Sequence, residues 1–185
     1  MGEQLKILGI CGSLRAGSFN LAALNAAVVL CPDDAEVEIY DISGFPAFNQ
    51  DLEQSPPGKV TEFKAAIRAS DAVVFSSPEY NYSMPGHLKN AIDWASRPYG
   101  DSAWDGKPAL IMGASPGTGG TMRMQYHLRQ TMVFLNMHPI NRPEVMISKC
   151  AEKFDEQGNL TDQSTREHIA EALDALITWT RKLKG

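Results

Sequence analysis

The sequence from Leu5 to Asn20, LKILGICGSLRAGSFN, decides the fold. It begins with an apolar run over 5–11 whose length and branched side chains predict a buried strand. Glycine, serine and arginine dominate the loop that follows, at 12–18. From Ser18 to about Leu30 apolar residues recur at helical spacing, and either Ser18 or Asn20 can cap that helix. The segment therefore predicts a strand, a polar loop and a helix in succession.

The rest of the chain repeats this alternation. Further strands are expected at 37–42, 72–77, 108–113 and 140–147, and further helices near 63–67 and at 86–95, 120–135 and 162–182. Five strands alternating with five helices predict right-handed crossovers and a five-stranded parallel sheet with helices on both faces, a three-layer α/β fold. Neither a repeat nor a linker interrupts the 185 residues, so we expect a single domain over 1–185. The order of the strands does not follow from the alternation.

The composition argues against several classes of protein. Lys and Arg total 17 and Asp and Glu total 22, so the net charge is −5. This charge argues against a nucleic-acid-binding protein, because phosphate contacts need a basic surface. No apolar run approaches the ~18 residues of a membrane span, and the start of the sequence does not resemble a secretory signal. Three widely spaced cysteines predict reduced thiols and a cytoplasmic protein. The histidines are scattered, so we expect no metal site, and we expect His87 at the surface or at an interface.

Three loops rich in Gly, Ser, Asn and Pro follow predicted strands, at 12–20, 78–85 and 114–120. In a parallel sheet they lie at the same edge, where ligands bind. The first loop predicts an anion site, because a helix start offers unpaired N–H groups and a favourable dipole. It matches neither GxxxxGK[ST] nor GxGxxG, so a monophosphate ester fits better than a pyrophosphate. The alternative is an ordinary capped helix with an exposed Arg15.

The second loop and the helix after it carry the most specific motif. Two tyrosines, two prolines and an amide over 78–85 predict a stiff wall for a flat aromatic ligand. The stretch 78–94 resembles the PEYNxSxPGxLKNAIDW motif of the flavodoxin-like NAD(P)H-dependent FMN reductases, which include quinone, chromate and azo-dye reductases. The first loop resembles that family's GSxRxxSxN motif, and 115–120 is similar to its third, glycine-rich loop. The resemblance extends from about residue 5 to 147.

This resemblance implies FMN as cofactor and NADPH or NADH as co-substrate. It implies that the FMN phosphate is held by Ser13, Arg15, Ser18 and Asn20. It places the isoalloxazine ring beside Pro78, Glu79, Tyr80 and Asn81, mostly against their main chain, with Ser115, Gly117 and Gly119 on the other side. The flavin carries the chemistry, so we expect no catalytic side chain. The implied reaction has a ping-pong order: NAD(P)H transfers a hydride to FMN, and the reduced flavin then gives two electrons to a small acceptor. The acceptor would be a quinone, chromate, an azo compound or free flavin.

Two other functions remain open, and one residue has two interpretations. A flavodoxin-type electron carrier would bind FMN without a nicotinamide substrate, although Arg15 and a charge of only −5 argue against it. A hydrolase with Ser13 as nucleophile would need a G-x-S-x-G turn, which is lacking around this serine. Glu79 is expected to be a solvated loop acid, and the alternative is a proton donor near the flavin.

The helix at 120–135 carries more apolar residues than one buried stripe can hold, which predicts a second buried face at a subunit contact. Arg123 and Tyr126 would lie on the polar margin of that contact, with Glu144 as an acidic partner. The resemblance also implies a dimer or tetramer, the assemblies that this family commonly forms. We therefore expect a homo-oligomer, a dimer or a homotetramer.

Overall fold

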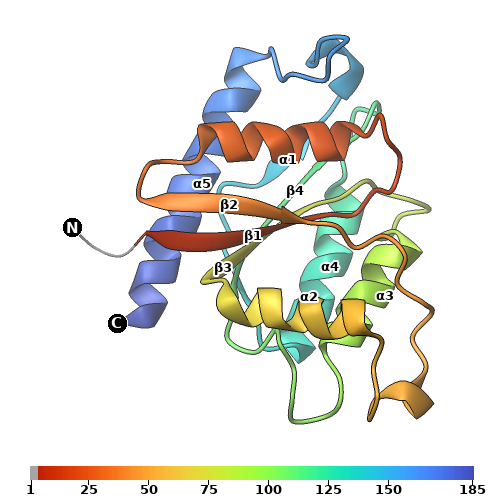
Figure 1. Ribbon diagram of the computed structural model, residues 1–185. Coiled ribbons are helices and arrows are strands. Elements are labelled where there is room, and N and C mark those ends of the chain that lie inside the picture. Colours follow the sequence, from red (N-terminus) through yellow and green to blue (C-terminus); the bar gives the residue numbers. More distant parts are fainter. Residues whose placement is uncertain (1–3) are drawn as a thin grey trace.

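Strands and helices alternate along the chain as predicted (Figure 1). The computed structural model describes residues 4–185. The strands are β1 Leu5–Cys11, β2 Ala35–Tyr40, β3 Ala72–Ser76, β4 Pro108–Ala114, β5 His138–Pro139 and β6 Val145–Ile147. The helices are α1 Phe19–Leu30, α2 Gly58–Ala69, α3 Gly86–Ala95, α4 Met122–Phe134 and α5 Gln163–Lys184, with short 3-10 turns η1 Gln50–Leu52 and η2 Cys150–Glu152. Within these residues no helix is both long and apolar enough to cross a membrane.

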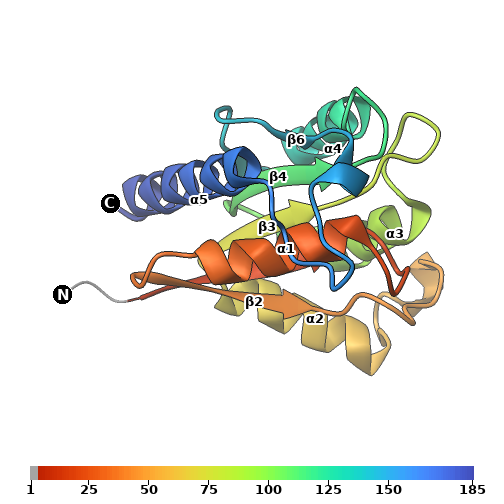
Figure 2. The same cartoon turned by 90° about the horizontal axis from the view of Figure 1, so that it is seen from above.

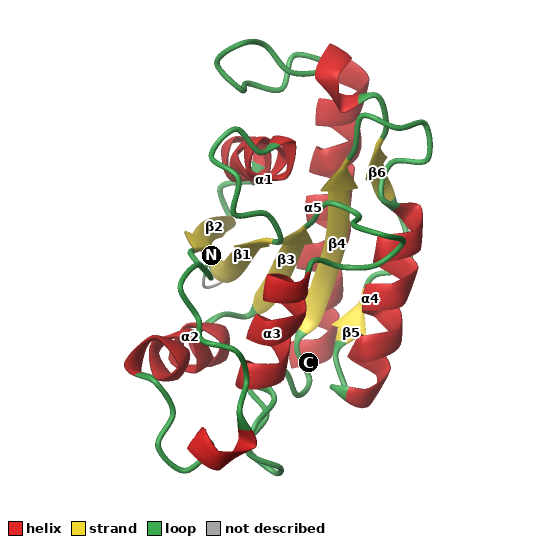
Figure 3. Cartoon of the chain, turned by 90° about the vertical axis from the view of Figure 1, so that its right-hand side faces the viewer, coloured by secondary structure: helices red, strands yellow, loops and turns green. Residues whose placement is uncertain are grey.

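The strands form one parallel sheet in the order β2-β1-β3-β4, and both β5 and β6 pair with the far edge of β4 (Figure 3). After β2 the chain crosses back over β1 to form β3, so the strand order reverses between β1 and β3. This is the flavodoxin-like order, and its ligand crevice lies beyond the carboxyl ends of the strands at that reversal. The predicted fold class is confirmed.

Helices cover both faces of the sheet (Figures 1 and 2). Alternate residues of β1 point to opposite faces: Ile7 packs with the buried side chains of α1 and α5, and Ile10 with those of α2, α3 and α4. The central strand β3 is buried along its whole length. The apolar runs recognised in the sequence are therefore strands covered on both sides, as expected in a parallel sheet.

The expected fifth strand at 140–147 was wrong in detail. There are two short strands instead: β5 lies just before the expected range, β6 covers its last three residues, and the segment between them leaves the sheet. Pro143 lies in that segment and has no N–H to give to a ladder hydrogen bond, so a continuous strand cannot form there. The second strand also ends earlier than expected, at Tyr40. Ile42 lies beyond it and is buried against the α2–α4 side of the core.

The start of α1 resolves the choice between the two predicted caps. The Ser18 side chain accepts hydrogen bonds from the main-chain N–H groups of Asn20 and Leu21, at 3.2 and 3.3 Å, so Ser18 is the N-cap. Helices α2 and α3 instead begin directly after Pro57 and Pro85, whose restricted φ suits a helix start. These three helix starts lie at the same edge of the sheet as the predicted loops.

Candidate active site

The three predicted loops meet at the carboxyl ends of β1, β3 and β4, around a cavity of about 270 Å³. The cavity is lined by Ser13, Arg15, Ser18, Phe19, Asn20, Pro78, Glu79, Tyr80, Ala114, Ser115 and Pro116. Of the predicted site residues, Asn81, Gly117 and Gly119 lie farther along their loops and do not line it. Phe19, Ala114 and Pro116 were missed, although each stands next to a residue that was predicted.

The first loop presents hydrogen-bond donors around the N-terminus of α1. Ser13 and Ser18 are buried, while Arg15 is exposed with its guanidinium 5.8 Å from the centre of the Phe19 ring. The Ser18 oxygen accepts from the main chain, which leaves its O–H free to donate. The first turn of α1 contains no acidic residue. Its dipole and these donors together favour an anion at this position.

Asn20 lines the cavity and also has a structural role that was not predicted. Its side-chain Nδ2 donates to the Ala114 carbonyl at 3.0 Å, and its Oδ1 accepts from the Ala114 N–H at 2.8 Å. The expected hydrogen bond to phosphate therefore competes with a buried pairing that already uses the oxygen and one amide hydrogen. The side chain joins the first loop to the end of β4, 94 residues away. That separation is why the local motif did not reveal this role.

The second loop folds into a tight hairpin that the sequence analysis did not foresee. Tyr80 and Ser83 exchange two main-chain hydrogen bonds, each 2.9 Å long. Between them Asn81 and Tyr82 have φ values of 50° and 65°, as in a type I′ turn. Tyr80 and Tyr82 are exposed beside the cavity. The predicted stiff wall is thus produced by the turn geometry as well as by the flanking prolines.

Glu79 is not the solvated loop acid that was expected. Its side chain is only 7% exposed and forms an ion pair with Arg123, with 2.5 Å between Oε1 and Nη2. Its Oε2 accepts from the N–H groups of Arg123 and Met124 at 3.0 and 3.1 Å, so the carboxylate caps the N-terminus of α4. The partners lie 44 and 45 residues away in the chain, beyond any local pattern. Because both carboxylate oxygens of Glu79 are engaged with α4, mainly its main-chain groups are available to a ligand in the cavity.

The third loop is tied to the segment that follows β6. Ser115 Oγ accepts from the Gly117 N–H at 3.1 Å, and the Ser115 carbonyl accepts from the Cys150 N–H at 3.1 Å. Lys149 N–H donates to the Gly117 carbonyl at 3.1 Å. These bonds hold the loop across the cavity from Pro78 and Tyr80. The conformation of the third loop is therefore fixed by hydrogen bonds within the loop and to the segment after β6.

Burial shifts the pKa of two ionisable side chains that contact the main chain of the first loop. His87, expected at the surface or at an interface, lies in the first turn of α3 with its Nε2 buried; burial lowers the pKa of its imidazole, although a hydrogen bond with the main chain of Gly12 opposes the shift. Burial also raises the pKa of the Cys11 thiol at the end of β1. Both groups are therefore neutral at pH 7. Among residues 4–185, no three His, Cys, Asp or Glu side chains gather to hold a metal ion.

A hydrolytic role for Ser13 receives no support from its surroundings. The Ser13 hydroxyl oxygen accepts a hydrogen bond from the Arg15 N–H at 3.4 Å. Within the described part of the chain, no histidine or carboxylate hydrogen-bonds to it to act as a general base. A serine nucleophile needs such a base within reach.

Comparison with known proteins places this site in a family. The profile of the NADPH-dependent FMN reductases matches residues 5–152, which include all three loops. The chain belongs to this family. It is 54% identical over 186 residues to an NAD(P)H-dependent FMN reductase of Pseudomonas aeruginosa, with both chains covered completely. It is 47% identical over 188 residues to an NAD(P)H:quinone oxidoreductase of Solanum tuberosum, covering 98% of this chain and 95% of that protein.

A solved structure shows the same architecture. FerB of Paracoccus denitrificans, a flavoenzyme NAD(P)H:(acceptor) oxidoreductase, superposes with a TM-score of 0.89 at 36% identity, covering 96% of this chain and 98% of that one. The FMN reductase described here is accordingly an oxidoreductase that uses FMN and NAD(P)H. The predicted family, enzyme class and cofactors are confirmed.

The cavity fits FMN on its own chemistry. A helix N-terminus, two buried serine hydroxyls and an exposed arginine offer donors and positive charge to a phosphate monoester. Pro78–Tyr80 of the second loop and Ser115–Pro116 of the third loop line the same cavity, and their proline and tyrosine side chains offer apolar surface to a ring system. Gly12 packs so tightly beneath the loop that a Cβ atom there would overlap the Ser77 side chain. The first loop and the start of the second loop are therefore in direct contact.

The buried Asn20 pairing generates a prediction about stability. Replacing Asn20 with alanine leaves the Ala114 N–H and C=O without partners in a buried setting, so we expect the free energy of unfolding to fall by about 1–3 kcal/mol. Urea unfolding followed by circular dichroism measures this loss. Asn25→Ala is the matched control, because Asn25 lies exposed on the same helix and its replacement should change stability by under ~0.5 kcal/mol. Equal losses for the two variants would contradict the structural role of Asn20.

Proposed function

We propose that this FMN reductase passes electrons from NAD(P)H to a quinone through one shared site, in ping-pong order. The observation that carries the proposal is the cavity at the meeting point of the three loops, which opens beside the exposed Tyr80. The names of several relatives support quinone as the acceptor, among them a 2-hydroxy-1,4-benzoquinone reductase of Burkholderia that is 41% identical over 177 residues. When bound, FMN supplies the hydride chemistry.

The chain's own residues bind and orient the reactants. In this proposal Arg15 and the hydroxyls of Ser13 and Ser18 hold the phosphate, and Asn20 keeps the loop in place. Main-chain groups of Pro78–Asn81 and of Ser115–Gly119 border the ring, so oriented N–H dipoles stabilise negative charge that develops on it. No side chain acts as a general acid or base. The exposed tyrosines leave one face open, and both substrates use that face in turn.

We also propose a domain organisation and a cellular location for the enzyme. Residues 1–185 form one domain in this proposal, since the two clusters of buried apolar residues pack on opposite faces of the same sheet. A cytoplasmic location is supported by three free cysteines, of which Cys11 and Cys150 are buried.

The phosphate assignment is tested by comparing two flavins. Arg15→Ala removes a charge-assisted hydrogen bond worth about 1.5–3 kcal/mol, so FMN should bind roughly ten- to a hundred-fold more weakly. Riboflavin lacks the phosphate and should bind as it does to the wild type. Quenching of flavin fluorescence gives both dissociation constants. Arg181→Ala, an exposed change on α5, should leave both constants unaltered. An equal loss for FMN and riboflavin would show that Arg15 does not contact the phosphate.

The order of the reaction is tested by steady-state and rapid kinetics. Varying NADPH or NADH at several fixed quinone concentrations should give parallel double-reciprocal lines, because one substrate leaves before the next binds. Anaerobic mixing of the FMN-loaded enzyme with NAD(P)H alone should bleach the flavin absorbance in a single turnover. Intersecting lines would refute the ping-pong order. A flavin that stays oxidised with both nicotinamides would instead favour the electron-carrier alternative.

We further propose that the enzyme is a homo-oligomer, a dimer or a tetramer, assembled through α4. This helix has two apolar faces: Met124, Leu128 and Met132 are buried in the core, whereas Val133 and Phe134 are 81% and 78% exposed. Exposed apolar surface of this kind is typical of a contact between subunits. Tyr126 lies on the same helix, and the nearby Glu144 carboxylate raises the pKa of its phenol, in line with the predicted pairing of these residues.

Assembly is tested by a charge on α4. Tyr126→Glu should lower the molar mass measured by light scattering at micromolar concentration, since it would bury an unpaired carboxylate beside Glu144. Gln163→Glu adds the same charge at the exposed start of α5 and should leave the mass unchanged. A wild-type protein that is monomeric and fully active would refute the proposed contact.

A further inference from the structure

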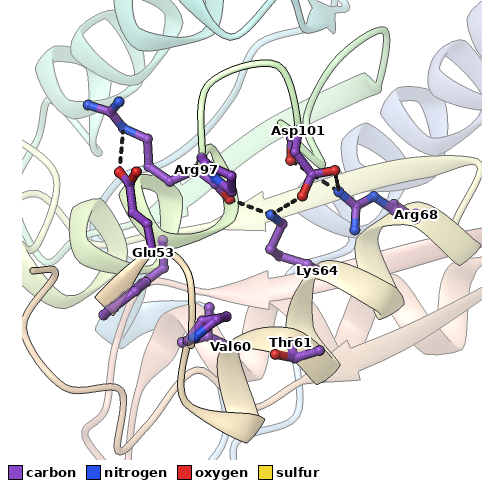
Figure 4. Close-up of a pocket in the computed structure, with 10 residues that line it drawn as sticks. Glu53, Val60, Thr61, Lys64, Arg68, Arg97 and Asp101 are labelled. Atoms are coloured by element: carbon purple, nitrogen blue, oxygen red, sulfur yellow. Dashed lines mark hydrogen bonds and ion pairs between the residues drawn. The ribbon is translucent and has the colours of Figure 1, made fainter. Parts of the chain in front are cut away.

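Two carboxylates that pair with arginine are nearly buried. Glu53 is 10% exposed and faces Arg97, with 3.8 Å between Oε1 and Nε, in a second cavity of about 240 Å³ between α2 and the turn after α3 (Figure 4). Glu79 is 7% exposed and pairs with Arg123. Of the two carboxylates only Glu79 lines the active-site cavity, since the two cavities have no lining residue in common. The Glu79–Arg123 pair is therefore the one placed to act on a bound flavin.

The two carboxylate oxygens of Glu79 have separate tasks. Oε2 accepts hydrogen bonds from the N–H groups of Arg123 and Met124, at 3.0 and 3.1 Å, and so caps α4. Oε1 lies 2.5 Å from Arg123 Nη2. The cap needs only an acceptor oxygen, whereas the contact with the guanidinium pairs a negative with a positive charge. A substitution that removes the charge of Glu79 but keeps an oxygen therefore separates the two tasks.

The Arg123 guanidinium also contacts the second loop. It lies 3.8 Å from the centre of the Tyr82 ring. Its side chain is 50% exposed, so water and salt screen its charge more than they screen the charge of the nearly buried Glu79. In the complete pair the two charges cancel, and the pair adds little net charge to this wall of the cavity.

We propose that the Glu79–Arg123 pair tunes how readily bound FMN is reduced, because Arg123 cancels a carboxylate that would otherwise oppose reduction. The inference rests on the position proposed above for the ring, beside Pro78–Asn81. Uptake of two electrons and one proton leaves one additional negative charge on a flavin ring, and charged groups near the ring tune this step. An unpaired carboxylate at the wall disfavours the reduced form, and an unpaired guanidinium favours it. Both side chains act through the field of their charges, and neither transfers a proton or an electron.

The midpoint potential of bound FMN tests this inference in the wild type, Glu79→Gln, Arg123→Met and the double variant. Equilibration of each FMN-loaded protein with a reference dye gives the value. Arg123→Met leaves Glu79 unpaired, so the ratio of reduced to oxidised FMN at a fixed potential should fall about ten-fold, or ~30 mV for a two-electron couple. Glu79→Gln should raise the ratio by a smaller factor, since the charge of Arg123 is screened. The double variant should return to within about two-fold of the wild-type ratio.

Matched variants control for the loss of an ion pair as such. Glu53→Gln and Arg97→Met make the same changes in the pair outside the active-site cavity, and they should leave the potential unaltered. Arg123→Lys keeps the positive charge but loses the stacking of a planar guanidinium on Tyr82, so its potential should stay near that of the wild type. Thermal unfolding and FMN content report whether each variant is folded.

Opposite signs for the two single variants at the active site, cancelling in the double variant, are the expected result. A purely structural role for the pair would move both potentials in the same direction or move neither, and either outcome overturns the inference. A shift in Glu53→Gln as large as that in Glu79→Gln also overturns it. Should Arg123→Met fail to fold, the comparison of these two glutamine variants still decides.

The NMR spectrum of the FMN-loaded wild type separates this inference from the proposed position of the ring. Reduction with dithionite should shift the main-chain amide signals of Tyr80 and Ser115, which line the cavity. If neither signal moves, the proposed ring position is wrong and the inference fails with it. If both signals move while the potentials of the variants equal that of the wild type, only the inference about the Glu79–Arg123 pair fails.

Discussion

The hydrogen bonds of Asn20 hold together the carboxyl ends of the strands on which the active site is built. Its side chain pairs with both main-chain groups of Ala114 at the end of β4, and its carbonyl accepts from the hydroxyl of Ser76 at the end of β3, at 2.8 Å. Its N–H is capped by Ser18 in the loop after β1. One residue thus connects three parallel strands at the point where the strand order reverses. The spacing between the first loop and the second and third loops depends on this junction, whose hydrogen bonds are buried and therefore costly to lose.

Glu79 plays a comparable part on the other side of the cavity. Its carboxylate closes the N-terminus of α4 and pairs with Arg123, whose guanidinium stacks on Tyr82, 3.8 Å from the ring centre. Ser83, in the same hairpin, is 2.8 Å from His127 on that helix. The second loop and α4 therefore form one unit. Any subunit packed on the outer face of α4 would be mechanically close to the ring-binding wall.

Local sequence patterns correctly predicted the features that depend on residues close together in the chain, such as strands and helix caps. The run 72–77 predicts a strand because its successive apolar residues, AVVF, fit no amphipathic pattern, and the observed strand covers 72–76. Ser18 caps α1 through groups two and three residues away. The family motif placed the three loops correctly. What it could not reveal are the partners of Asn20 and Glu79, which stand 94 and 44 residues along the chain. Those pairings depend on strand order and helix placement, and both polar side chains were consequently assigned to ligand or solvent.

The type I′ turn in the second loop bears on how such enzymes change over evolution. Two main-chain hydrogen bonds between Tyr80 and Ser83 close this turn, so the shape of the wall is set by the chain's own backbone. Asn81 and Tyr82 occupy left-handed backbone positions, which β-branched residues adopt only with strain. Substitutions at these two exposed positions are accordingly tolerated best when the new residue accepts a positive φ, as Asn, Asp, His and Gly do. Substitutions at these two positions can thus change the polarity of the exposed surface at the tip of the second loop more easily than they change the path of its backbone.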